Sequence, residues 1–331
     1  MRKAKLLCRE KSFDSFLQEE IISASFDEIL EQVSQIPTKK LSVAAAQDLP
    51  VMEAVKEAYD RKIAVPILTG DEAKIREIAK QIGWDLDACG IRVINEPDVE
   101  QAALAAVKLV HDGEADMYMK GLLESKTFLR SVLNKEVGLR TGKMLSHVCV
   151  FQIKGIDRLL FLTDVAFLPY PTLEDKEQII NYVVKVCNAC GVQNPKVAPL
   201  AAVEVVNPKM PVTVEADQLT KWNEEGRIKG CIVDGPLSMD LAIDPEAAKH
   251  KAGAQNRRIV GDADVLLFPD IHAGNLVYKT IVRMTEFKNG CILMGTKAPA
   301  ILTSRSDSKE TKINSIALAA VVAHHLNGQG F

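Results

Sequence analysis

The chain has 331 residues, which is longer than a single hydrophobic core usually grows, so its length favours two domains. Hydrophobic residues make up 47% and charged residues 26% of the sequence, as in an ordinary globular protein, and the net charge of -3 gives no electrostatic reason to expect a nucleic-acid or membrane partner. No apolar run reaches the roughly 18 residues of a membrane span, and the start lacks the apolar stretch of a signal peptide, so a cytoplasmic location is expected.

The first part of the chain alternates between strand and helix patterns. Residues 1–38 carry an amphipathic pattern that ends at Pro37, which predicts a helical extension. From Leu41 to about residue 121, apolar runs alternate with helical patterns, which predicts a parallel, doubly wound α/β sheet with right-handed crossovers. The segment contains neither GxGxxG nor GxxxxGK[ST], and this disfavours dinucleotide and P-loop nucleotide binding.

A second α/β pattern follows Gly142. Residues 146–153 and 158–164 are apolar runs around a short polar turn, which predicts a hairpin. Asp164 ends the second run and suits either bracing of the following loop or a role in a site. Thr172, with Asp175 three residues on, predicts the capping box of the next helix.

Further strands are expected over residues 196–206 and 231–237, with a helix around residues 216–225 between them. Asp234 and Gly235 lie in the second of these strands, just before a proline. A carboxylate followed by a Gly-Pro turn at a strand's carboxyl end suits a ligand site, although it is equally ordinary turn chemistry.

Residues 261–307 hold the densest set of polar side chains beside apolar runs. The buried run 265–268 is followed by a predicted loop that carries Asp270, His272, Gly274 and Asn275. A helix is predicted from about residue 276 to residue 287, with Lys279 in its first turns, and then two strands over residues 291–294 and 300–303. In an open α/β sheet, ligands bind beyond the carboxyl ends of the strands, so we expect a site here.

The turn that follows has its own chemistry. Ser304, Arg305, Ser306 and Asp307 stand immediately before a helical pattern that runs from about residue 308 to residue 326. Free backbone N–H groups, the positive end of a helix dipole and a forked guanidinium can converge there on one anion. This combination suits a phosphate or an acyl phosphate.

The seven cysteines fit reduced, buried thiols better than a disulfide framework. Cys187 and Cys190 form a CxxC late in a predicted helix, with Gly191 as its C-cap, but no second pair and no nearby histidine completes a zinc site. We therefore predict that this pair is structural and that the protein has no metal site.

Four segments resemble the phosphate acetyltransferase and phosphate butyryltransferase family, and they look closer to its butyryl branch. They are LTDVAFLPYPTLEDK at 162–176, DGPLSMDLA at 234–242, ADVLLFPDIHAGNLVYK at 263–279 and LTSRSDS at 302–308. The resemblance runs from about residue 40 to the C-terminus, and four long motifs in the family's order make it specific.

The resemblance implies two doubly wound α/β domains with a cleft between them, the architecture of isocitrate and isopropylmalate dehydrogenases. The first domain would comprise residues 1–142 plus 309–331, because the last helix returns to it, and the second would comprise residues 143–308.

The resemblance also implies the site. Ser304, Arg305, Asp307 and Lys279 are the expected catalytic residues. The expected substrate-binding residues are Arg130, Lys120, Asp234, Gly235, Asp270, Gly274 and Asn275. The family's acetyltransferases use a second arginine from a segment that this chain lacks, and Lys120 is proposed to replace its charge.

The implied reaction converts an acyl-CoA and phosphate reversibly to an acyl phosphate and CoA. No metal or cofactor is required, because CoA ester and phosphate are both substrates. Thr311 stands where the family has a proposed aspartate base for the CoA thiol, so Asp307 or Glu310 would replace it. The same two residues also have the spacing of an N-cap and its capping box.

A butyryl or branched acyl group is expected, with acetyl-CoA as the alternative. The family implies a homodimer or higher homo-oligomer and a functional partner that is an acyl kinase, such as butyrate kinase. A decarboxylating dehydrogenase would need an acidic metal-binding set and a nucleotide site that the sequence does not offer. A non-catalytic sensor of acyl-CoA or acyl phosphate would keep the cleft without the chemistry.

Overall fold

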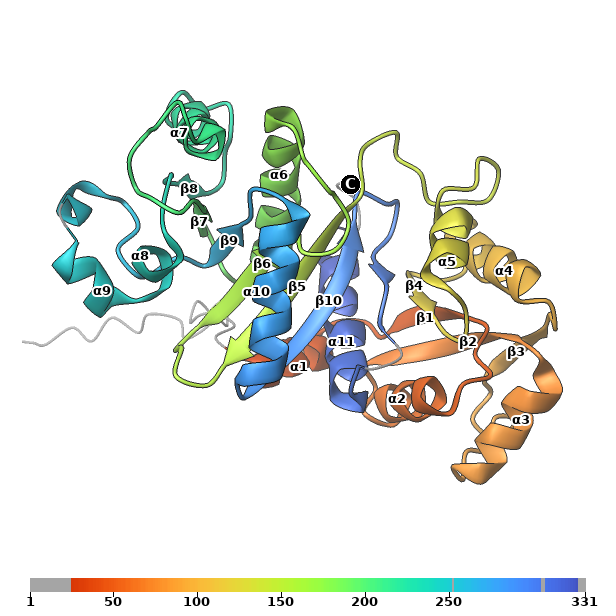
Figure 1. Cartoon of the computed structure of the whole chain (residues 1–331). Helices are drawn as coiled ribbons and strands as arrows, with labels where there is room; N and C mark the ends of the chain where they lie inside the picture. Colours follow the sequence, from red (N-terminus) through yellow and green to blue (C-terminus); the bar gives the residue numbers. More distant parts are fainter. Residues whose placement is uncertain (1–24, 252, 305–306, 327–331) are drawn as a thin grey trace, which may run out of the picture.

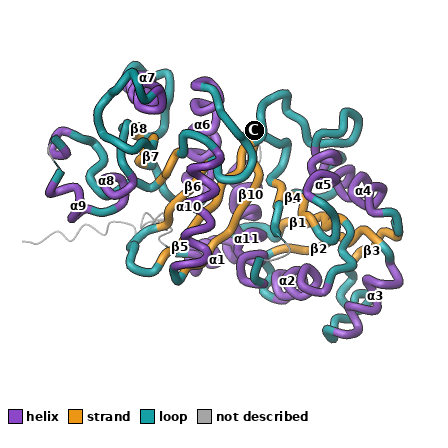
Figure 2. The backbone as a smooth tube through the Cα atoms, viewed as in Figure 1, coloured by secondary structure: helices purple, strands orange, loops and turns teal. Residues whose placement is uncertain are grey.

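The computed structural model of the chain describes residues 25–251, 253–304 and 307–326. These residues form one mixed sheet of 11 strands with helices on both faces (Figures 1 and 2). The strands are β1 (Lys39–Ala44), β2 (Ala64–Gly70), β3 (Arg92–Asn95), β4 (Met117–Lys120), β5 (Ser146–Ile153), β6 (Leu159–Thr163), β7 (Lys196–Pro199), β8 (Ile232–Val233), β9 (Val265–Leu267), β10 (Phe287–Met294) and β11 (Ala300–Ile301).

The helices are α1 (Phe26–Gln35), α2 (Leu49–Asp60), α3 (Glu72–Gln81), α4 (Val99–His111), α5 (Ser125–Val132), α6 (Leu173–Ala189), α7 (Pro211–Glu224), α8 (Met239–Ile243), α9 (Pro245–His250), α10 (Ile271–Met284) and α11 (Lys309–Leu326), with a 3₁₀ turn η1 (Ala254–Asn256). Asp48, Asp71 and Asp98 cap α2, α3 and α4 with their carboxylates, as acidic residues do at the positive end of a helix. The capping box predicted for Thr172 and Asp175 is present at the start of α6.

The strand order is β3-β2-β1-β4-β11-β10-β5-β6-β9-β7-β8. In this spatial order, neighbouring strands are parallel from β3 through β2, β1 and β4 to β11. β10 and β5 are antiparallel to both of their neighbours. Neighbouring strands are parallel again from β6 through β9 and β7 to β8. This confirms the predicted α/β fold class, the parallel first half and the β5–β6 hairpin. The sheet continues across the predicted domain boundary, because β11 pairs with β4 of the first half and β10 pairs with β5 of the second.

The two faces of the sheet are packed differently. On one face a single hydrophobic cluster spans both halves, and we call it the shared core; it includes Phe26 of α1, Met119 of β4, Val148 of β5, Ile180 of α6 and Ile316 of α11. On the other face the buried residues form two separate clusters. One lies under α4 and α5, and the other lies under α8 and α10. The gap between these two clusters is where the cleft described below opens.

Helix α11 is central to the shared core. Of its 18 residues 14 are buried, so it has no broad solvent face despite lying at the end of the chain. It packs against α2 and α1, and also against β10 and α6. The helix therefore contacts both halves, and the division into residues 1–142 plus 309–331 and residues 143–308 stays a prediction.

Several element boundaries differ from the sequence predictions. The strand expected over residues 231–237 is only Ile232–Val233, so Asp234 and Gly235 follow it, and the strand expected over residues 300–303 ends at Ile301. The strand expected over residues 196–206 ends at Pro199, because its partner strands β8 and β9 are short, and Val205 and Val206 are exposed. Residues 271–275, predicted as loop, form the first turns of α10. That helix stops at Met284, and β10 begins at Phe287, four residues before the strand that was predicted over residues 291–294.

No helix in the described part of the chain combines the length and the apolar character that a membrane crossing requires.

Gly274 sits where α10 crosses the end of β6. A Cβ atom added there would collide with the backbone carbonyl oxygen of Asp164. We predict that Gly274→Ala destabilises the protein by about 1–2 kcal/mol, because the collision outweighs the roughly 1 kcal/mol that alanine gains in a helix. Urea unfolding measures the change. Leu276→Ala, at a side chain that is 68% exposed on the same helix, is the control and should shift stability by less than about 0.5 kcal/mol.

Cys187 and Cys190 are both fully buried at the end of α6. Burial raises the pKa of both thiols, that of Cys190 to about 12. Among the described residues they join no group of three metal-ligating side chains. We predict that Cys187→Ser/Cys190→Ser leaves the metal content of the purified protein unchanged, as elemental analysis will report; a zinc ion lost only in this variant would contradict the assignment.

Candidate functional site

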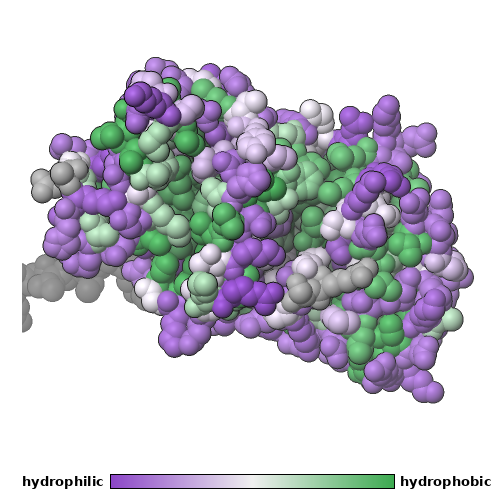
Figure 3. Space-filling view, viewed as in Figure 1, coloured by the Kyte–Doolittle hydropathy of each residue, from purple (hydrophilic) through white to green (hydrophobic). Residues whose placement is uncertain are grey.

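A cleft of about 790 Å³ opens between the two halves of the sheet. Its walls come from the β4–α5 junction, β5, the loop after β6, α10, β10 and the turn before α11. Apolar surface is exposed in the middle of the molecule between the two halves (Figure 3). The cleft lies at the carboxyl ends of β4, β6 and β11, as expected for ligand sites in α/β sheets.

The turn before α11 is held by Asp307. Its Oδ2 accepts the backbone N–H of Ser304 at 2.6 Å, and its own N–H donates to the Ser304 carbonyl at 3.2 Å. Ser304 and Asp307 both line the cleft, as predicted. Arg305 lies outside the described residues, so its predicted role is carried by the sequence alone.

Ser308, rather than Asp307, caps α11. Its Oγ accepts the N–H of Thr311 at 3.0 Å, so the capping box predicted from Asp307 and Glu310 is wrong. The capping serine frees the Asp307 carboxylate to brace the turn. Thr311, which stands in place of the family's aspartate, lines the cleft and donates to Asn289 Oδ1 at 2.8 Å.

Lys312 supports the same turn from below. This lysine is 1% exposed, and its Nζ donates to the Asp307 carbonyl at 2.5 Å. Burial lowers the pKa of Lys312, while the nearby carboxylates of Asp307 and Asp48 oppose that change. The Lys312 amine thus lies beneath the predicted anion site, one turn into α11.

The β4–α5 junction contributes Lys120 but not Arg130. Lys120 is 5% exposed, lines the cleft and donates from Nζ to the carbonyl of Leu123 at 3.0 Å. Arg130 points to the surface, where it pairs with Glu100 at 3.0 Å and is 60% exposed. The structure therefore does not bring Arg130 together with the other predicted residues, and its role in binding stays a prediction.

Helix α10 brings Asn275 and Lys279 to the cleft. Asn275 Nδ2 donates to the Val165 carbonyl at 3.0 Å, which fixes the loop after β6. Lys279 is exposed, with its Nζ 5.6 Å from the centre of the Tyr278 ring. Asp270 accepts the N–H groups of the first turn of α10 as its N-cap, at 2.8 and 3.0 Å, so this carboxylate is engaged in building the helix.

Asp164 is buried and braces the cleft from beneath. Its two carboxylate oxygens accept four hydrogen bonds of 2.7 to 3.1 Å from Ser146 Oγ and from the backbone N–H groups of His147, Ala166 and Phe167. Four donors satisfy the hydrogen-bonding capacity of a buried carboxyl group. Of the two roles that the sequence left open, the structure supports bracing.

Asp234 and Gly235 lie away from the cleft. Asp234 accepts from the Arg257 guanidinium at 2.9 Å and from two backbone N–H groups, at 2.7 and 3.1 Å. Gly235 packs closely against the ring of Pro199. These contacts organise the loop after β8, and the predicted substrate contacts of the pair stay predictions.

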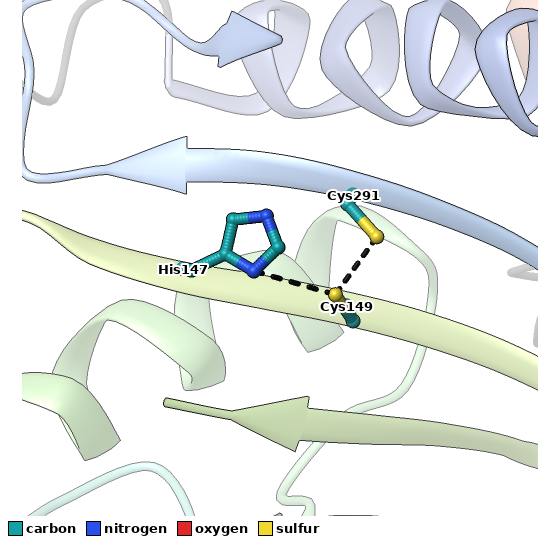
Figure 4. Close-up of side chains that lie close together, drawn as sticks. All are labelled: His147, Cys149 and Cys291. Carbon is teal, nitrogen blue, oxygen red and sulfur yellow. Dashed lines mark hydrogen bonds between the residues drawn. The ribbon is translucent and has the colours of Figure 1, made fainter. Parts of the chain in front are cut away.

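Three residues that the sequence analysis did not single out lie together at the base of the cleft. His147 and Cys149 of β5 and Cys291 of β10 point toward one another, and His147 and Cys291 line the cleft (Figure 4). Burial lowers the pKa of His147, so its imidazole is neutral near pH 7, and burial raises the pKa of Cys149. The alternation of strand side chains places His147 and Cys149 on one face, but no sequence signal predicts that Cys291 lies opposite them.

Comparison with known proteins agrees with this geometry. A family model described as "Phosphate acetyl/butaryl transferase" matches residues 92–320. A phosphate butyryltransferase of Clostridium acetobutylicum is 56% identical over 90% of this chain and 98% of its own length, and a phosphate acetyltransferase of Thermotoga maritima is 43% identical over 90% of this chain and 100% of its own. The crystal structure of a branched-chain phosphotransacylase from Enterococcus faecalis superposes with a TM-score of 0.75 at 32% identity, covering 87% of this chain and 100% of that one. The predicted resemblance is thus confirmed: the chain belongs to the phosphate acetyl/butyryl transferase family.

Proposed function

We propose that the protein transfers a short acyl group reversibly between CoA and phosphate, with butyryl-CoA or a branched-chain acyl-CoA as its substrate. Family membership and the name of the relative at 56% identity support the reaction and the acyl group. The observation that carries the proposal is that one cleft is lined by Lys120, Lys279, Ser304 and Asp307, which come from distant parts of the chain.

The chemistry asks for positive charge and hydrogen-bond donors. A phosphate oxygen attacks the thioester carbonyl, and a tetrahedral oxyanion forms before the CoA thiolate leaves. An anionic nucleophile must therefore be held beside a second developing anion, so much of the catalysis comes from cations and from positioning. Lys120 and Lys279, the start of α11 and the Arg305 guanidinium are our candidates for these roles.

The base for the CoA thiol is proposed to be Asp307. It lines the cleft, whereas Glu310 is exposed and lies 3.9 Å from the Lys288 ammonium. A thiol with a pKa of about 8.5 needs only a modest base.

The acyl group is proposed to lie against the apolar part of the cleft. Leu123 and Leu129 stand on the α5 side, and Val282 and Phe287 stand on the α10 side. Each additional methylene buried there contributes about 0.8 kcal/mol, which favours a four-carbon chain over acetyl.

We further propose a cytoplasmic homodimer or higher homo-oligomer that works with an acyl kinase such as butyrate kinase. CoA ester and phosphate are the only small molecules that the reaction requires. Family resemblance supports the oligomeric state and the kinase partner, and the sequence pattern supports the location.

The reaction predicts release of CoA thiol from butyryl-CoA only when phosphate is present, at a higher kcat/KM than from acetyl-CoA. A thiol reagent follows the release continuously. Equal rates with and without phosphate would contradict acyl transfer to phosphate. A strong preference for acetyl-CoA would leave the reaction class intact but overturn the butyryl assignment, and binding without turnover would identify a sensor.

Arg305 is predicted to grip phosphate through its forked guanidinium. Arg305→Ala should lower kcat by about a hundredfold, since a lost transition-state contact of roughly 3 kcal/mol corresponds to that factor. Arg305→Lys keeps the charge but loses the fork and should still lose at least about tenfold. Steady-state kinetics in both substrates measure the loss, and it should fall on kcat as well as on the KM for phosphate.

The control is Arg76→Lys, because Arg76 makes its ion pairs with Glu72 and Asp87 on the surface. An arginine that merely braced the turn would lower the thermal midpoint with little kinetic change in the folded fraction. Near-wild-type kinetics at an unchanged midpoint in Arg305→Lys would remove this residue from the site.

A further inference from the structure

The cluster of His147, Cys149 and Cys291 has no task in the acyl transfer proposed above. Its candidate ligand atoms all lie within 4.8 Å of one another. Cys149 Sγ is 3.4 Å from His147 Nδ1 and 2.8 Å from Cys291 Sγ (Figure 4). Each of the three residues is at most 6% exposed.

The three side chains are held by the most extensively paired strands of the sheet. Cys149 and Cys291 are directly opposite in the antiparallel β5–β10 ladder. The N–H of Cys291 donates to Ser315 Oγ of α11, at 2.9 Å, and so points away from β5. The two cysteines are therefore a non-hydrogen-bonded pair, the type whose Cα atoms approach to about 4.5 Å and whose side chains lie closest.

His147 joins the pair because it lies two residues before Cys149. Side chains at that spacing on a strand share one face of the sheet. Its backbone is fixed from the other side, since its N–H donates to Asp164 Oδ2 at 2.9 Å and its carbonyl accepts from Thr163 Oγ1 at 3.1 Å. A nitrogen and two sulfurs are thus positioned by backbone contacts, without help from a flexible loop.

In contrast to the absence of a metal site expected from the sequence, we propose that His147, Cys149 and Cys291 form a binding site for one Zn²⁺ ion at the base of the cleft. Zinc in proteins takes imidazole nitrogen and cysteine sulfur ligands in tetrahedral geometry, with three protein ligands where one position stays open. Two thiolates balance the charge of the dication, so a neutral unit is buried. Binding releases the two thiol protons to solvent.

The distances fit this ion after a small adjustment. Zinc bonds of about 2.0–2.1 Å to nitrogen and 2.3 Å to sulfur place a nitrogen and a sulfur about 3.5 Å apart and two sulfurs about 3.7 Å apart. The 3.4 Å between Cys149 Sγ and His147 Nδ1 already matches. The sulfurs, at 2.8 Å, must separate by about 1 Å, which requires a change in the side-chain torsion of one of the two cysteines.

The surroundings favour a cation. The carboxylates of Asp164 and Asp307 are near enough to influence the ionisation of both His147 and Cys149. Tyr278 of α10 lines the same cleft as His147 and Cys291. Lys120 and Lys279 oppose the ion from the cleft walls, where an anionic ligand would neutralise them.

The open coordination position faces the cleft. His147 and Cys291 line the cleft and Cys149 is fully buried behind them, so a fourth ligand enters from the cleft side. Water fills that position, or a thiol-bearing ligand in the cleft. Among the described residues no further histidine, cysteine, aspartate or glutamate completes the group.

Cobalt titration of the full-length protein tests the site directly. The protein is reduced, stripped with a chelator and titrated with Co²⁺, which reports thiolate ligation by charge-transfer absorption in the near ultraviolet. We expect one equivalent of cobalt, displaced by one equivalent of Zn²⁺. Cys149→Ser and Cys291→Ser should abolish the absorption and weaken binding by more than about a hundredfold, since even outer-shell partners are worth roughly 10 to 100-fold.

The matched control is Cys187→Ser/Cys190→Ser, which removes two buried thiols that lack a histidine. This variant should keep the full absorption. Wild-type protein that shows no thiolate-to-cobalt absorption overturns the proposal, whatever the variants do. It is also overturned by equal cobalt absorption in Cys149→Ser and Cys291→Ser, or by a Cys149–Cys291 disulfide whose reduction yields no metal binding. None of these outcomes depends on acyl-transfer activity.

Discussion

The burial of α11 holds the structure together. This helix closes the shared core, with α2 and α1 on one side and β10 and α6 on the other. Because one cluster of apolar side chains serves both halves of the sheet, either half would expose a large hydrophobic surface without the other. On the opposite face no helix of the described residues bridges the two clusters, and the space between them is the cleft. The site is thus a consequence of packing that is continuous on one face and divided on the other.

Many polar groups around the cleft have a structural role, because they hold the segments that form its walls. Four side chains form hydrogen bonds with backbone groups of the segments that form the walls: Asp164, Asn275, Asp307 and Lys312. A loop that crosses a cleft has no ladder to satisfy its backbone, so side chains must do so. The result is a rigid frame in which Lys279 and Ser304 are exposed to the ligand space.

The sequence predicted the type and order of the helices and strands better than the residues at which they begin and end. Alternating apolar patterns were enough for the parallel half and for the hairpin, since these depend on local periodicity. The start of α10 was missed because the helix begins at Ile271, directly after its cap Asp270, and its Gly274 looked like a loop residue. A glycine is needed at position 274 because any Cβ atom there would collide with the carbonyl oxygen of Asp164. The two residues are about 110 positions apart in the chain, so no local sequence pattern encodes this contact.

The site was predicted in part for the same reason. Strand ends and family motifs led to the prediction of five residues that do share the cleft, namely Lys120, Asn275, Lys279, Ser304 and Asp307. Arg130 was placed by a motif on a short helix, and the turn of that helix directs it to Glu100 instead. His147 and Cys291 lie within apolar runs, where a polar side chain is ordinarily core, and only the register of β5 against β10 brings them together.

The sheet is narrowest at β11. This strand has two residues, which pair with β4 at two positions and with β10 at one, through Leu293 and Ala300. Beyond it, β10 and β5 share an eight-residue ladder. A rotation of one half against the other breaks the fewest backbone hydrogen bonds at β11, which leads directly into the turn that carries Ser304 and Asp307. The weakest backbone pairing between the two halves and the turn that carries Ser304 and Asp307 therefore fall on the same short stretch of chain, so a rotation at β11 would move both of these residues.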